Sequence, residues 1–229
     1  MSESVSFPLE GTVPVFPLPN AVFFPHTLIP LHIFEPRYRE MVADAIAGER
    51  RIAMALLRDG WESDYEGRPP IHPVGCLGRI SREERLPNGR WNIVLLGLAR
   101  VRFLQENGDQ PYRIAGYEVV QDASSPLDPQ AREVKRRRLV ELFLRLTDRQ
   151  GAPADALIEA FRKIEPLGAL ADLVASALPL DVPAKQRLLE EPDPLARFET
   201  LLDFLERQGA SPVPARRRRL PYPPPQNLN

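Results

Sequence analysis

Cysteine is nearly absent from this sequence of 229 residues, and lysine is scarce. The single cysteine, Cys76, excludes a disulfide within the chain and is typical of a protein in a reducing compartment. The only lysines are Lys135, Lys163 and Lys185, and the residue before each of them is not glycine. The Gly-Lys-Ser/Thr core of a phosphate-binding P-loop is therefore missing.

Metal-binding patterns and membrane-spanning runs are missing as well. The three histidines, His26, His32 and His72, lack the close spacing of a zinc motif, so we expect no metal and no cofactor. No apolar run approaches the ~20 residues that cross a bilayer, and the N-terminus MSESVSFPLEG lacks the features of a signal peptide. We therefore expect a soluble cytoplasmic protein that binds no membrane.

Net charge is also small. The 30 Lys and Arg residues nearly balance the 31 Asp and Glu residues, which leaves a net charge of −1. A chain with this balance has no overall field that would attract nucleic acid or an anionic membrane surface.

What the sequence does contain is a proline-rich apolar stretch, FPLPNAVFFPHTLIPLHIFEPRY, from Phe16 to Tyr38. Its prolines forbid a continuous helix. Residues 28–34 alternate, with Ile29, Leu31 and Ile33 on one face and Leu28, Pro30, His32 and Phe34 on the other. The alternation predicts a strand that is apolar on both faces, and Pro30 limits it to a sheet edge or a bulge.

Further elements follow from the pattern of turns and apolar positions. A helix is predicted over residues 36–47, with Pro36 in its first turn and Gly48 as its stop. Short strands are predicted at residues 51–57 and 112–120, and a hairpin at Asn88-Gly89. After residues 122–130 the pattern becomes helical, and Asp193 is the predicted N-cap of the last helix. We predict a β-rich lobe at 1–121, a helical lobe at 122–209, and an extended Pro/Arg-rich tail at 210–229.

Three stretches, in the same order, resemble the N-terminal substrate-binding domain of Lon proteases. They are FPLPNAVFFPHTLIPLHIFEPRYREMV, then HPVGCLGRI followed by the hairpin, and LADLVASALPLDVPAKQRLLEEPDPLARFETLLDFL. The resemblance covers residues 13–208 and implies an α+β fold, with a PUA-like β pseudo-barrel followed by an α-helical bundle. Lon proteases continue into an ATPase and a Ser-Lys protease domain, which this sequence lacks. We therefore expect that it is not an enzyme.

The residues that the resemblance marks most sharply are Glu35, Arg37 and Tyr38, at the junction of the predicted strand and helix. We predict that Arg37 and Tyr38 contribute to a peptide-binding site; the alternative is that Arg37 pairs with Glu35 while Tyr38 packs. The loop residues Trp61, Tyr65 and Arg68 are a second set of peptide-binding candidates, because aromatic and Arg side chains are common at binding surfaces. The alternative is that these aromatics cover one end of the barrel.

Other chemistry-bearing residues have simpler interpretations. Cys76 lies in a predicted strand and is expected to be a buried, inert thiol. Glu83 and Glu84 are neighbours on a strand, so they face opposite sides and do not form a catalytic pair. The run REVKRRR, at 132–138, is expected to be a solvated helix face; the alternative is that it contacts an anion or RNA.

These observations favour a non-catalytic module that binds unfolded proteins or exposed apolar segments, as an adaptor or regulator of proteolysis. A protease or a chaperone is a candidate partner. The alternative is an RNA-binding PUA-like module, against which the near-neutral charge argues, because nucleic-acid affinity depends largely on phosphate neutralisation.

Overall fold

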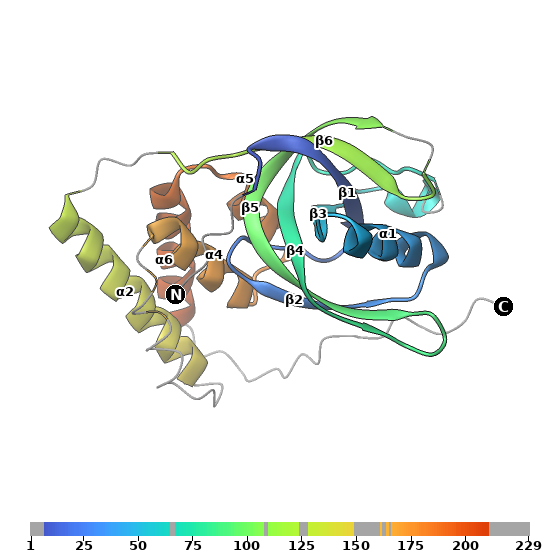
Figure 1. Ribbon diagram of the computed structural model, residues 1–229. Helices are drawn as coiled ribbons and strands as arrows, with labels where there is room; N and C mark the ends of the chain where they lie inside the picture. The colour runs from blue at the N-terminus through green and yellow to red at the C-terminus, as the bar shows by residue number, and fades with distance from the viewer. Residues whose placement is uncertain are drawn as a thin grey trace.

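The computed structural model describes residues 7–64, 67–107, 110–123, 128–148, 161, 164 and 166–210. Its strands are β1 (Glu10–Leu18), β2 (Leu28–Ile33), β3 (Arg51–Leu56), β4 (Val74–Arg85), β5 (Trp91–Asn107) and β6 (Arg113–Val119). Its helices are α1 (Pro36–Ala47), α2 (Pro129–Asp148), α4 (Leu167–Ala177), α5 (Val182–Glu190) and α6 (Pro194–Ala210), with a short 3-10 helix η1 (Trp61–Asp64). This order confirms the predicted α+β fold, with strands before the main group of helices (Figure 1).

The six strands form a sheet that closes on itself. Their order is β2-β5-β4-β3-β1-β6, and β5 also pairs with β6. Strand β5 can do this because it is 17 residues long: its first part pairs with β2 and its last part with β6. The pairing of β1 with β3 is parallel, whereas the other pairings are antiparallel. Strand β2 pairs only with β5 among the named strands, which confirms the edge position predicted from Pro30.

Helix α1 begins and ends where its sequence predicts. Pro36 occupies the first helical position, where its missing N–H costs nothing, and Gly48 follows the last turn. The buried side chains of the helix are Tyr38, Met41, Val42 and Ala45. They join the core inside the barrel, and each large side chain contributes about 1.5–3 kcal/mol when it is buried. This packing fixes the start of α1 against the barrel.

The hairpin between β4 and β5 lies at the predicted Asn88-Gly89. The last paired residues are Arg85 and Trp91, and the Leu86 N–H donates to the Arg90 carbonyl at 2.8 Å. Gly89 has φ +75°, a conformation that glycine adopts without the steric cost of a Cβ.

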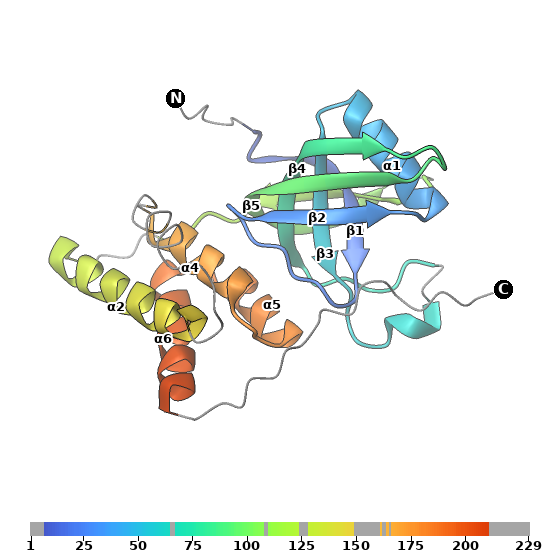
Figure 2. The same ribbon diagram turned by 90° about the horizontal axis from the view of Figure 1, so that it is seen from below.

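Helices α2, α4, α5 and α6 gather on one side of the barrel, and α1 lies on the opposite side (Figures 1 and 2). Helices α2, α4, α5 and α6 share a core of apolar side chains that includes Leu139, Phe143, Leu170, Val174 and Phe198. The predicted N-cap of α6 is confirmed, because the Leu195 N–H donates to the Asp193 carboxylate at 2.8 Å. Most of residues 154–164, which belong to the predicted helical lobe, and the tail from residue 211 lie outside the described residues. The boundary between lobes at residue 121 stays a prediction.

A buried ion-pair network joins the barrel to the helices. Arg100 of β5 donates to the Asp172 carboxylate of α4 at 2.9 Å, and Arg197 of α6 donates to the same carboxylate at 3.2 Å. Asp122 accepts from Arg197 at 2.7 Å. The side chains of Arg100, Asp172 and Arg197 are each at most 3% exposed.

Strand β2 is apolar on both faces, as predicted, but only one face is buried. Ile33 lies in the barrel core, with Ile29 and Leu31 packed against it. On the outer face, Leu28 is 64% exposed and Phe34, just beyond the strand, is 42% exposed. The exposed face is therefore an apolar edge on the surface of the barrel.

Candidate functional site

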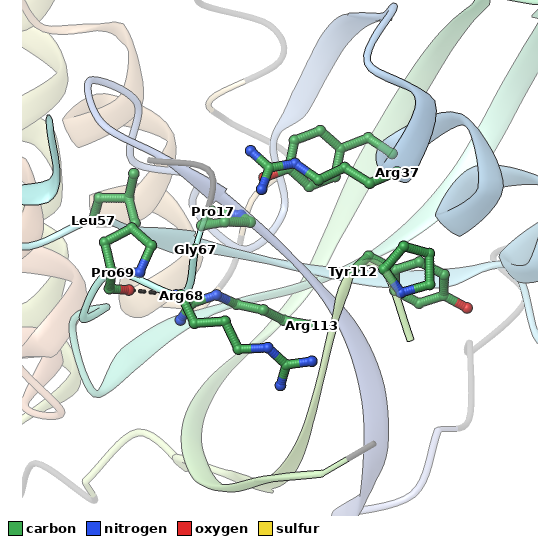
Figure 3. A pocket seen from close by; sticks show the side chains of 10 residues that line it. Pro17, Arg37, Leu57, Gly67, Arg68, Pro69, Tyr112 and Arg113 are labelled. Atoms are coloured by element: carbon green, nitrogen blue, oxygen red, sulfur yellow. Dashed lines mark hydrogen bonds between the residues drawn. The ribbon is translucent and has the colours of Figure 1, made fainter. Parts of the chain in front are cut away.

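A pocket of about 180 Å³ lies where the start of α1 meets the loop that follows η1 (Figure 3). Segments distant in the sequence contribute to it: the end of β1, the first turn of α1, the residue after β3, residues 67–69, and residues 111–113. Closure of the barrel brings the starts of β6 and α1 to the same place, so the pocket depends on the complete fold.

Much of the lining is apolar and held in place. It includes four aliphatic residues and two aromatic rings: Pro17, Leu57, Pro69, Pro111, Tyr38 and Tyr112. Tyr38 is 5% exposed and packs edge-on against the Phe16 ring, with 4.7 Å between ring centroids. The Tyr112 hydroxyl donates to the Asp44 carboxylate of α1 at 2.7 Å. Burial and the Asp44 carboxylate raise the pKa of Tyr112, so its hydroxyl stays protonated at neutral pH.

Three arginines complete the pocket, and none of the described residues that line it is acidic. Arg37 comes from α1, Arg68 from the loop and Arg113 from the start of β6 (Figure 3). Arg37 is within 3.1 Å of the Glu35 carboxylate, and its guanidinium lies 4.7 Å from the centre of the Tyr38 ring. The Arg37 guanidinium and the Tyr38 ring thus attract each other in a cation–π interaction.

Arg113 is the most deeply buried of the three, at 5% exposed. Its guanidinium donates to the Glu106 carboxylate at 2.9 Å and to the Pro69 carbonyl. Burial lowers the pKa of Arg113, and the nearby Glu106 carboxylate opposes this effect. Arg68, by contrast, is 44% exposed; it donates to the Gln110 carbonyl at 3.3 Å and lies 4.0 Å from Glu106. The pocket therefore combines one fixed, desolvated cation with one accessible cation.

The comparison with protein families identifies the domain. The sequence model of the ATP-dependent protease La (LON) substrate-binding domain matches residues 12–207. The chain belongs to this family.

Relatives agree with this assignment. The Lon protease of Anaeromyxobacter dehalogenans is 28% identical over 202 residues, which is 87% of this chain and 24% of the relative. Lon protease 2 of Herpetosiphon aurantiacus is 30% identical over 179 residues, which is 78% of this chain and 22% of the relative. The chain thus spans about a quarter of the length of these Lon proteases.

Solved structures of Lon N-terminal domains have a similar fold. The domain from the Mycobacterium avium complex Lon protease has a TM-score of 0.68 at 21% identity, over 86% of this chain and 98% of that one. The Lon N-terminal domain protein from Xanthomonas campestris has a TM-score of 0.62 at 23% identity, over 85% and 98% of the two chains. Together they confirm the fold expected from the resemblance.

The Lon-type fold brings together three of the five residues predicted to bind peptide. Arg37, Tyr38 and Arg68 line the same pocket, although 30 residues separate Tyr38 from Arg68. Trp61 lies on η1, is half-buried and is not part of the pocket lining; Tyr65 lies outside the described residues. The local alternative is also observed, because Arg37 pairs with Glu35 and Tyr38 packs on Phe16. Peptide binding by these residues stays a prediction.

Sequence reasoning missed Pro17, Tyr112 and Arg113. Each belongs to a strand end whose position depends on long-range pairing. Arg113 pairs with Val15 of β1, and β1 pairs in parallel with β3. Neither pairing has a local signal. The one available hint was Pro111, since a proline directly before a predicted strand marks an exposed strand start.

The other chemistry-bearing residues have structural partners in this Lon-family domain. Cys76 is fully buried, and burial raises the pKa of its thiol, which matches the inert thiol expected. Glu83 pairs with Arg50, and Glu84 accepts from the Asn92 amide at 2.9 Å. Across the described part of the chain, no group of three His, Cys, Asp or Glu side chains could hold a metal ion. No helix in that part is long and apolar enough to cross a membrane.

The basic run on α2 is largely paired with glutamates. Arg137 pairs with Glu133 at 2.7 Å, and Arg138 with Glu206 of α6 at 3.3 Å. The side chains of both ion pairs are exposed, so each pair contributes little to stability. Their arrangement matches the solvated helix face that the sequence predicts.

Proposed function

We propose that this chain binds exposed, unstructured segments of other proteins and performs no chemistry on them. The observation that carries the proposal is the match of the Lon substrate-binding domain family to residues 12–207 of the 229-residue chain. An adaptor or a regulator of proteolysis is the role that fits such a module, with a protease or a chaperone as partner. The cytoplasmic location expected from the sequence stays a prediction.

The pocket beside α1 is our candidate for the binding site. Its apolar lining suits the side chains that folded proteins bury and unfolded proteins expose, and its arginines can orient a polar group. The exposed apolar side chains Leu28 and Phe34 add further apolar surface on β2. Phe34 precedes the pocket residue Arg37 by three positions, so β2 leads directly to the pocket.

The residues of this chain give little support for a catalytic function. The only thiol, Cys76, is buried and its raised pKa disfavours the thiolate, which is the nucleophilic form. The sequence has no Gly-Lys pair for a P-loop. RNA binding also has weaker support, because Lys135, Arg137 and Arg138 of α2 already contact the carboxylates of Glu199, Glu133 and Glu206.

The proposal is tested with a fluorescently labelled protein that is kept unfolded by reduction and alkylation of its cysteines. The native, disulfide-bonded form of the same protein is the control. We expect the unfolded form to bind with a micromolar Kd that changes little between roughly 50 and 200 mM salt, because apolar contacts are not screened. A labelled RNA should bind weakly, and any such binding should fall steeply over the same range. Equal binding of native and unfolded forms would contradict the proposal.

A pair of variants tests whether Trp61, which is not among the residues that line the pocket, and Tyr65 also contribute to binding. Replacing Trp61 and Tyr65 by Ala should weaken binding if the η1 loop contributes, and an unchanged circular dichroism spectrum would show that the variant folds. Val134→Ala is the control, because Val134 is 63% exposed on α2, on the far side of the barrel from α1. Unfolding of the double variant would instead assign these aromatics to the barrel cover.

A further inference from the structure

The pocket beside α1 combines a small volume with two kinds of lining. Its volume of about 180 Å³ is below the ~300–1,000 Å³ of typical small-molecule sites. This volume matches that of one large amino-acid residue rather than that of a nucleotide or of several residues of a chain. Within that volume the lining offers apolar groups, such as Pro17 and Leu57, and the guanidinium groups of Arg37, Arg68 and Arg113.

We propose that this pocket binds the C-terminal residue of a client polypeptide, through its free carboxylate and an apolar side chain. The inference rests on the proposed function, the binding of unstructured protein segments. A carboxylate complements guanidinium groups, which offer paired N–H donors in a planar fork. The apolar side chain of the same residue contacts the proline and leucine walls.

A C-terminal residue fits better than an internal acidic residue. Within the volume of one residue, the C-terminal residue presents both a carboxylate and an apolar side chain. An internal Asp or Glu uses its side chain for the carboxylate and leaves the apolar walls without a partner. An internal residue also requires the chain to enter and leave the pocket, whereas a chain end enters once. The small volume therefore favours the chain end.

The arginines have different roles in this site. Arg113 is held by Glu106 and by the Pro69 carbonyl, so its position is fixed before a ligand arrives. Because Arg113 is buried, a carboxylate beside it interacts in a low-dielectric environment, where both its attraction to Arg113 and its repulsion from Glu106 are stronger than in water. Arg68 is accessible and lies on the loop between η1 and β4, so it can approach the carboxylate. Arg68 is the residue to change, because its substitution leaves the core intact.

The experiment compares three labelled peptides that share one sequence, apart from a single glutamate in the third, and measures their binding to the full chain by fluorescence anisotropy. The first ends in leucine with a free carboxylate, and the second ends in a leucine amide. The third is also an amide but carries a glutamate before the leucine, so its total charge equals that of the first. We expect the free acid to bind about tenfold more tightly than either amide, because only it places the carboxylate at the arginines.

Two variants connect this difference to the pocket. Arg68→Gln should reduce the preference for the free acid severalfold. Arg102→Gln is the matched control, since Arg102 is 49% exposed and pairs with Glu118 outside the pocket. It should keep the full preference. Arg113→Gln is a less suitable probe, because loss of a buried, bonded guanidinium destabilises the fold.

Each alternative outcome overturns the inference in a distinct way. Equal affinities of the free acid and the leucine amide would exclude carboxylate recognition. A glutamate-containing amide that binds as tightly as the free acid would assign the pocket to acidic side chains. Equal effects of Arg68→Gln and Arg102→Gln would move the site away from the pocket. If no peptide binds while the unfolded protein does, this inference fails and the proposed function survives; if neither binds, both fail.

Discussion

Phe23 and Phe24 are neighbours in the chain, but their side chains pack in different hydrophobic cores. Phe23 lies in the barrel core, whereas Phe24 is fully buried among the helices that follow the barrel. The Phe24 carbonyl accepts from the Thr27 hydroxyl at 2.7 Å. A Cβ at Gly97 would lie 2.2 Å from the same carbonyl oxygen, so β5 approaches this loop closely. The loop before β2 thus ties the barrel to the helices.

Replacing Phe24 by Ala should loosen the helices more than the barrel. We expect the free energy of unfolding to fall by about 3–5 kcal/mol, as for other buried Phe side chains. Amide hydrogen exchange should become faster mainly in α4 and α6, whose buried apolar side chains belong to the same core as Phe24. Phe23→Ala is the matched control, and it should speed exchange mainly in the barrel strands. The same exchange pattern in both variants would contradict the separation of the cores.

Asp172 is the carboxylate at the centre of the buried network. Asp172→Asn removes the buried carboxylate that Arg100 and Arg197 share and leaves them only the partly exposed Asp122 carboxylate, and breaking a buried pair typically costs about 3–5 kcal/mol. Urea denaturation should show this decrease in the free energy of unfolding. In the control, Glu118→Gln, the exposed pair with Arg102 is lost, and the change should stay within about 1 kcal/mol. Similar losses in the two variants would show that the network is solvated.

Cys76 should not react with thiol reagents in the folded protein. Its side chain is fully buried, and burial raises the pKa of the thiol, so both access and the thiolate fraction are low. A chromogenic disulfide reagent at neutral pH should label one thiol per chain in guanidinium chloride and almost none in buffer. Rapid labelling of the native protein would mean that β4 opens readily.

Local features of the sequence predicted the elements well. Pro36 and Gly48 mark the ends of α1 because both act through the backbone of their own turn. The hairpin at Asn88-Gly89 depends on residues that are adjacent in the chain. The alternation in β2 predicted which side chains share a face of the strand. It could not predict that the outer face stays exposed, because exposure depends on what packs there.

Contacts between distant segments were the part that local patterns could not predict. The pocket needs β6 to pair with both β1 and β5, and this pairing brings Arg113 to Arg68. The buried network did have a signal, since Asp172 is the only charged residue in the apolar helix α4. A charge on such a helix is stable only with partners. The sequence does not indicate that the partners are Arg100 and Arg197.

Tyr112 gives a prediction for alkaline pH. Its hydroxyl donates to Asp44 at 2.7 Å, and a hydrogen bond to a charged group contributes about 1.5–3 kcal/mol. Between about pH 7 and 9, the free energy of unfolding of Tyr112→Phe should be lower than that of the wild type by about this amount.

Above pH 10, the ordinary pKa of tyrosine, this difference should shrink. Burial and the Asp44 carboxylate raise the pKa of Tyr112 in the folded state, so the folded chain keeps a proton that the unfolded chain loses. The folded state then binds more protons than the unfolded state, and its stability falls as pH rises. The Phe variant has no such proton, so its stability does not include this decrease. Parallel urea titrations of both proteins measure this difference in the free energy of unfolding. A difference that stays constant at alkaline pH would mean that Tyr112 ionises as readily in the folded chain as in the unfolded one.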